Sequence, residues 1–169
     1  MKKPDATEYA PYFNTYVSLV PEDDIISALE GQKRTTLNLL KGIDETLGNH
    51  RYEPSKWSVK EVVGHVIDAE RAFAFRAFHF GRNHQTPLPG FDQDSVAPVA
   101  PFAGMTMPQI AHEYGCVRDS GLELFRHFDD AAWSRRGVAN KNEITVRALA
   151  YVILGHERHH IQILKSRYL

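Results

Sequence analysis

The sequence has very little cysteine: Cys116 is the single thiol among 169 residues. One thiol cannot form a disulfide within the chain. The lack of internal disulfides is common among proteins of a reducing compartment. Long apolar runs are missing too, since no stretch reaches the roughly 20 residues that span a bilayer. The basic start at Lys2 and Lys3 is not followed by an apolar run of signal-peptide length. We therefore expect a cytoplasmic protein without a membrane partner.

The sequence also lacks an excess of charge of either sign. Its 20 basic and 21 acidic residues give a formal net charge of −1. Proteins that bind nucleic acids carry a clearly basic surface, so no nucleic-acid partner is expected. A chain of this length can bury an apolar core without disulfides and has the size of one domain. We predict a single domain over residues 1–169.

Four segments carry apolar residues at helical spacing. The predicted helices cover about residues 21–47, 58–81, 106–128 and 145–164. Ser58 with Glu61, and Thr106 with Gln109, have the spacing of capping boxes at helix starts, and Thr145 is a predicted N-cap for the last helix. Four amphipathic helices predict an all-α four-helix bundle, a fold that builds its cofactor sites between facing helices.

A long loop is predicted between the second and third helices. Residues 82–105 contain four prolines and two glycines and show no helical period, and Phe91 and Phe102 supply apolar anchors. Loops of this length in compact domains are often functional. We expect the loop to form part of the rim of a site, although it could instead only cap the bundle end or support a dimer contact. A polar linker is expected over residues 135–143, and no strand is expected anywhere.

Nine histidines are present, and three of them are predicted to face the bundle interior. His156 and His160 lie one turn apart on the helix face that also carries Ile153. His65 lies beside Val62 on the inward face of the second helix. Neutral imidazoles bind zinc, nickel, copper and iron, and three protein nitrogens with an open position are typical of catalytic metal sites. We predict a divalent metal bound by His65, His156 and His160; the alternative is ordinary core or surface histidines, although burying unpartnered imidazoles is costly.

The six other histidines are predicted to be solvated or only adjacent to that site. His79 follows His65 by 14 residues, roughly 21 Å along a helix axis, which is too far for a shared ion. His159 is rotated away from the inward pair on its own helix. The same prediction applies to His50, His84, His112 and His127.

The segment from His156 to His160 is also a literal H-E-x-x-H match, the zinc-protease pattern in which the glutamate is the general base. No His, Asp or Glu follows His160 as a third downstream ligand, so we do not expect a protease. Glu157 is then either a base or neighbour of the site, or a solvated helix glutamate.

Three more side chains have open interpretations. Asp68 either accepts the second ring N–H of a ligand histidine or forms an ion pair with Arg71 or Arg76. Trp57 is expected to plug one end of the bundle. Cys116 is not expected to be a nucleophile, because no partner base is identifiable for it.

Three motifs resemble those of the DinB-like four-helix metalloprotein superfamily, which includes the YfiT-like metal-dependent hydrolases. Lys56 to Glu61 followed by His65, Asp68 and Glu70 is similar to its second-helix signature, residues 89–94 (PGFDQD) to its loop segment, and residues 155–162 (GHERHHIQ) to its final-helix signature. The resemblance implies a four-helix bundle, often a homodimer, in which His65, His156 and His160 bind Zn²⁺ or Ni²⁺. It also implies activities such as transfer of low-molecular-weight thiols, for example bacillithiol or mycothiol, and a thiol-dependent isomerisation.

Two functional hypotheses follow. The first is a metal-dependent enzyme that transfers a small thiol or hydrolyses a small molecule, because a bound ion lowers the pKa of a thiol or water. The second is a non-catalytic metal-binding bundle with a structural or interaction role. A DNA-binding role is disfavoured by the near-neutral charge. The catalytic residues themselves are not identifiable from the sequence.

The choice of His160 over His159 is directly testable. The two positions differ by about 100° in helix azimuth, so only His160 should face the ion. We expect His159→Ala to keep bound metal and His160→Ala to lose most of it, measured by elemental analysis of the purified variants. Equal loss in both variants would contradict the choice.

Overall fold

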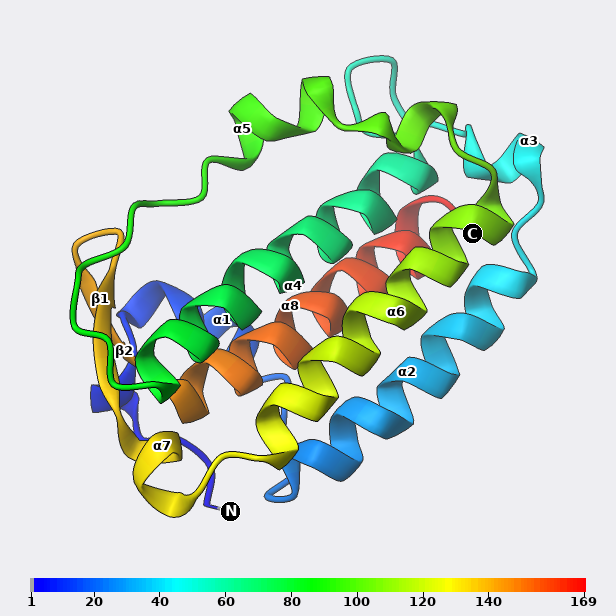
Figure 1. Ribbon diagram of the computed structural model, residues 1–169. Coiled ribbons are helices and arrows are strands. Elements are labelled where there is room, and N and C mark those ends of the chain that lie inside the picture. The colour runs from blue at the N-terminus through cyan, green and yellow to red at the C-terminus, as the bar shows by residue number, and fades with distance from the viewer. Residues whose placement is uncertain (1) are drawn as a thin grey trace.

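The computed structural model describes residues 2–169, and four long helices form its main body (Figure 1). They are α2 (Ile25–Lys41), α4 (Val59–Gly81), α6 (Met107–Arg126) and α8 (Val146–Arg167). Each packs against two others, in the cyclic order α4, α8, α2, α6. The predicted all-α four-helix bundle is confirmed. Among the described helices, none combines the length and apolar character needed to cross a membrane.

Three of the four helix starts agree with the sequence prediction. The hydroxyl groups of Ser58 and Thr106 accept the backbone N–H groups of Glu61 and Gln109, and both capping boxes are complete. The Thr145 side chain accepts the N–H of Ala148 at the start of α8. Each box satisfies two of the orphan donors of a helix end.

The first predicted helix was too long at both ends. Its N-cap is Asp24, whose carboxylate accepts the N–H of Ser27, so α2 begins at Ile25 and not at Pro21. It ends at Lys41, and Asp44 caps a separate turn, α3 (Glu45–Gly48). The carboxylate of a second aspartate therefore begins a new short helix. The spacing of the apolar residues does not reveal this break.

The expectation of no strand was wrong in the predicted polar linker. β1 (Arg136–Ala139) and β2 (Asn142–Thr145) form an antiparallel hairpin. Its two turn residues, Asn140 and Lys141, have φ angles of 49° and 64°. Two consecutive positive φ angles are the signature of a type I′ turn, which usually contains glycine. Because Asn-Lys is a weak form of that signal and the strands are short, the sequence pattern did not reveal the hairpin.

Short elements fill the remaining connections. The predicted loop contains α5 (Gln93–Val96) and 3₁₀ turns at Ala97–Val99 and Pro101–Gly104. It passes the hairpin and returns over α4 toward the start of α6 (Figure 1). The chain before α2 contains 3₁₀ turns at Ala6–Glu8 and Pro11–Phe13 and helix α1 (Asn14–Val17), while α7 (Asp130–Ser134) precedes the hairpin. Helix α1 packs against α8.

A buried ionic cluster joins all four long helices. Arg118 on α6 is completely buried and binds Glu70 of α4 through Nε and Nη2 at 2.7 and 2.8 Å. The same Nη2 lies 2.5 Å from Glu157 Oε2 on α8, and Nη1 donates to the Leu29 carbonyl of α2 at 3.3 Å. Burial raises the pKa of the Glu70 carboxyl, and Arg118 opposes that shift.

Glu157 is fully buried, so its interpretation as a solvated helix glutamate was wrong. Besides Arg118, its carboxylate accepts hydrogen bonds from Thr36 on α2 and from the Tyr114 hydroxyl on α6, the latter at 2.8 Å. Both carboxylate oxygens are occupied. Buried charges of this kind are stable only when they are paired and hydrogen-bonded.

Removing Arg118 should leave two buried carboxylates without a cation. We expect Arg118→Ala to lower the free energy of unfolding by about 3–5 kcal/mol, measured by urea denaturation. Arg126→Ala on the same helix removes an exposed ion pair with Glu30, and it should leave the denaturation midpoint almost unchanged, because exposed pairs contribute little. Similar midpoints for both variants would show that the cluster is not a major stabilising element.

Candidate metal centre

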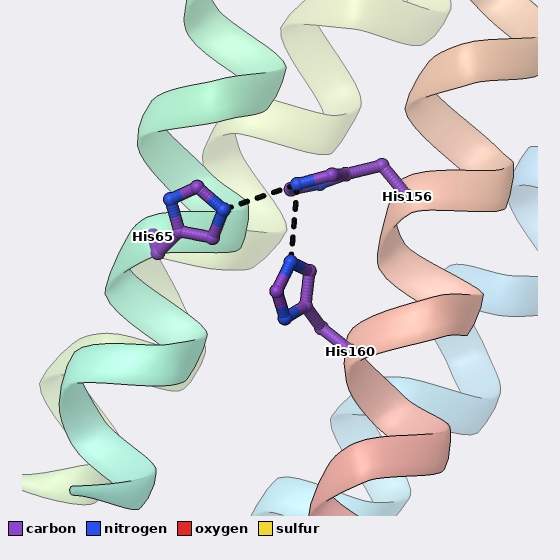
Figure 2. A group of neighbouring side chains, drawn as sticks. All are labelled: His65, His156 and His160. Atoms are coloured by element: carbon purple, nitrogen blue, oxygen red, sulfur yellow. Dashed lines mark hydrogen bonds between the residues drawn. The ribbon is translucent and has the colours of Figure 1, made fainter. Parts of the chain in front are cut away.

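Three imidazoles converge between α4 and α8 (Figure 2). The Nε2 atom of His156 lies 3.1 Å from Nε2 of His65 and 3.2 Å from Nε2 of His160. One nitrogen from each ring lies within 4.8 Å of the other two, and in residues 2–169 no further His, Cys, Asp or Glu belongs to this group. The structure thus brings together the three histidines that the sequence singled out.

The donor set suits a transition metal. Two nitrogens bound tetrahedrally at about 2.0–2.1 Å from one zinc ion are about 3.3 Å apart, close to the separations here. Burial lowers the pKa of His65 to about 4 and, with the charge of His65 and His159, that of His160 to about 3. Burial also lowers the pKa of His156 well below its usual value. At neutral pH the rings are therefore uncharged, which is the state that binds metals.

Glycine stands directly before two of these histidines and lets other segments approach closely. A Cβ atom on Gly155 would lie 2.1 Å from the backbone oxygen of Tyr16, so α1 rests directly on α8. The Tyr16 ring then lies 5.1 Å from the His156 ring, measured between centroids. On α4, a Cβ atom on Gly64 would lie 2.1 Å from the Phe102 ring, so glycine allows the long loop to dock beside His65.

A cavity of about 280 Å³ opens beside His65 and His156. Its walls come from five parts of the chain: the segment before α2, the helices α4 and α8, the long loop and the hairpin. Five of its lining residues are aromatic, namely Tyr12, Phe13, Tyr16, Phe73 and Phe91. This size and lining are typical of a site for a compact small molecule.

The long loop and the missed hairpin both contribute to this site. Phe91 and Gln93 of the loop line the cavity together with Asn140 and Asn142 of the hairpin. Phe102 is buried against α4 in a smaller hollow that His65 also lines. The structure therefore places the 82–105 segment at the rim of the histidine group, as the sequence analysis expected.

Tyr16 is a phenol beside His156 that the sequence did not reveal as part of the site. Its hydroxyl shares a 2.9 Å hydrogen bond with the Tyr12 hydroxyl. Burial raises the pKa of Tyr16 well above its usual value, so the hydroxyl keeps its proton and can donate a hydrogen bond but cannot serve as a base. No sequence signal pointed to it, because it lies in a four-residue helix.

The neighbouring side chains take definite positions. Asp68 forms an ion pair with Arg71 at 3.1 Å, the second of its two predicted interpretations. The Trp57 ring centroid lies 5.1 Å from that of His65, so Trp57 packs against the site as well as against the adjoining core. His159 stands outside the group of three nitrogens and packs edge-on against Tyr16. Cys116 is exposed and lines a different groove.

The remaining histidines lie away from the group of three nitrogens. His79, in the last turn of α4, and His84, just after the helix, contact one another through ring nitrogens 3.0 Å apart. The Nδ1 atom of His127 contacts the backbone oxygen of Glu123 at 2.7 Å.

A four-helix bundle with three histidines converging between two of its helices defines a recognisable class of protein. The chain belongs to the DinB superfamily, whose family model matches residues 28–164. No curated protein matches the chain by sequence.

Two solved structures share the fold. YfiT from Bacillus subtilis, described as a probable metal-dependent hydrolase with an unusual four-helix bundle topology, has a TM-score of 0.74 at 17% identity, over 90% of this chain and 94% of YfiT. The mycothiol-dependent maleylpyruvate isomerase has a TM-score of 0.68 at 11% identity, over 86% of this chain and 61% of the isomerase. At these identities the likeness establishes the fold.

The contact between Gly155 and α1 can be tested by adding one methyl group. We expect Gly155→Ala to destabilise the protein by about 1–3 kcal/mol, because the methyl group would overlap the Tyr16 backbone. Gly31→Ala, also inside a long helix, meets no close atom and should stabilise by about 0.5–1 kcal/mol. Urea denaturation of both variants measures the two signs, and a stabilising Gly155→Ala would contradict this packing.

Proposed function

We propose that this protein is a metal-dependent enzyme in which His65, His156 and His160 bind one divalent ion, Zn²⁺ or Ni²⁺. The observation that carries the proposal is the convergence of three uncharged imidazoles, two buried and one partly buried, beside a cavity. An ion bound there lowers the pKa of a thiol or a water molecule that completes its coordination. Three neutral ligands leave the charge of the ion uncompensated, which favours an anionic fourth partner.

Activation of a small thiol is the reaction that these surroundings favour. Glu157, the glutamate of the H-E-x-x-H match, is held in the ionic cluster by Arg118 and Tyr114. Asp68 is paired with Arg71, and Asp94 is an exposed residue of the loop that acts on the pKa of His65 only through its charge. A thiol, with a pKa near 8.5, needs less help to ionise than water.

The chain's own residues would then bind and orient the reactants. The aromatic side chains offer apolar contacts to a substrate, and the Tyr16 hydroxyl can donate a hydrogen bond to an electrophile or leaving group in the cavity. The solved neighbours described as a metal-dependent hydrolase and a mycothiol-dependent isomerase support small-molecule chemistry. Transfer of a low-molecular-weight thiol to an electrophile is therefore the proposed reaction, with hydrolysis as its alternative; a homodimer stays a prediction.

Metal content is the first test. Untagged protein supplemented with zinc or nickel should hold about one ion per chain and release it to a chelator, since three histidines form one site. His65→Ala should lose most of that ion, whereas His112→Ala, far from the cluster, should keep it. Less than about a tenth of an equivalent in the supplemented wild-type protein would refute the site.

Activity assays distinguish thiol transfer from hydrolysis. The metal-loaded protein should accelerate conjugation of bacillithiol or mycothiol to monochlorobimane, and chelation should abolish the acceleration. Hydrolysis of 4-nitrophenyl acetate without thiol would point to the hydrolase instead. A stoichiometric metal with neither activity, together with higher thermal stability on metal binding, would support the non-catalytic bundle.

A further inference from the structure

The cavity beside the histidines contains a buried arginine without an acidic partner. Arg76 of α4 is 8% exposed and lines the cavity together with His65 and His156. Its Nη2 donates to the Pro89 carbonyl at 3.2 Å, and its guanidinium lies 5.5 Å from the Phe73 ring centroid. Within residues 2–169, no Asp or Glu forms an ion pair with it, and burial alone lowers its pKa.

The other buried cations in the described part of the chain have acidic partners, and Arg76 does not. Lys60 is paired with Glu45 at 2.7 Å, and Arg118 is paired with two glutamates. Burying a cation without a counter-charge is costly, and a guanidinium has five N–H donors, of which the protein satisfies one here. An anion that enters the cavity would supply the missing partner.

The lining limits the kind of anion. Of the side chains described around this cavity, Arg76 is the one cation, and none is acidic. One positive charge balances one negative charge, and the planar guanidinium pairs with a carboxylate through two parallel hydrogen bonds. The aromatic walls suit an apolar body, and a volume of about 280 Å³ admits a compact molecule.

The helix sets the distance between the two ends of the site. His65, Phe73 and Arg76 lie on one side of α4, because separations of eight and eleven residues correspond to roughly 2.2 and 3.1 turns and keep the three side chains within an arc of about 80°. Eleven residues correspond to about 16 Å along the axis. The long Arg76 side chain extends back toward the N-terminus of the helix. Its guanidinium group is therefore on the order of 10 Å from the histidines.

We propose that Arg76 is the substrate-binding residue of this cavity and that the substrate is a small monocarboxylate with an apolar body. Its carboxylate pairs with Arg76 while its reacting end lies at the three histidines. This assignment rests on the proposed function for the reacting end, but the anion preference itself does not require a metal.

The test begins with chelator-treated protein and two matched probes, 4-phenylbutyrate and 4-phenylbutan-1-ol. The wild-type protein should bind the acid about ten-fold more tightly than the alcohol by titration calorimetry, because a hydrogen-bonded charge pair is available only to the acid. Arg76→Gln should abolish that preference. Arg71→Gln, which removes a cation from the exposed side of the same helix, should keep it.

A second experiment tests whether one ligand can reach both the histidine group and Arg76. In Co²⁺-loaded protein, 6-mercaptohexanoate and 6-mercaptohexan-1-ol should both change the visible cobalt spectrum, and the acid should do so at about ten-fold lower concentration unless Arg76 is replaced. Arg76→Gln should also keep or raise the thermal midpoint of the ligand-free protein, because it removes an unpaired buried charge. A purely structural arginine would lower that midpoint.

Three results would overturn the inference, and a fourth would affect only the proposed function. Equal binding of acid and alcohol by chelated wild-type protein would overturn the inference, and so would an acid preference that survives Arg76→Gln. If Arg71→Gln also lost the preference for the acid, that preference would come from the net charge of the protein and not from Arg76, and the inference would be overturned. Failure to bind cobalt would refute the proposed function alone, because the chelator-treated arm still decides the anion site.

Discussion

The pairing of Arg118 with two buried glutamates is the constraint on which the rest of the structure depends. Its hydrogen bonds reach α2, α4 and α8 from α6, so one guanidinium fixes how the four long helices face one another. Glu157 must point toward Arg118, and adjacent residues of a helix differ by about 100° in direction. His156, the preceding residue, is thereby turned toward α4 and His65. The ionic cluster thus aligns the histidines without contacting them.

The site combines this alignment with close packing around the histidines. Tyr16 reaches His156 because Gly155 lets α1 touch α8, and Phe102 packs over Gly64 beside His65. Burial keeps the three imidazoles uncharged, and no acidic side chain among the described residues forms an ion pair with the buried Arg76. The cavity between them therefore has imidazole nitrogens at one end and a cation at the other. An active site commonly keeps such unsatisfied groups for its substrate, at a cost in stability.

Local signals in the sequence predicted the bundle and the histidine group well. Capping boxes at Ser58 and Thr106 mark helix starts through contacts within one turn, and the i, i+4 spacing of His156 and His160 is a property of one helix. The parts that were missed depend on contacts between distant segments. Glu157 looks solvated in sequence because its partner Arg118 lies 39 residues away. The hairpin's turn at Asn140 lacks the usual glycine, and nothing local indicates that it would border the cavity.

The central claim is that three imidazoles bind one ion and leave a position open to the cavity. X-ray absorption at the metal edge of the zinc- or nickel-loaded protein measures this most directly, because scattering from imidazole rings is distinguishable from that of single light atoms. We predict three imidazole nitrogens, at about 2.0–2.1 Å for zinc, together with at least one oxygen or sulfur donor from outside the protein. Two or fewer imidazoles, or a shell closed by a fourth protein side chain, would contradict it.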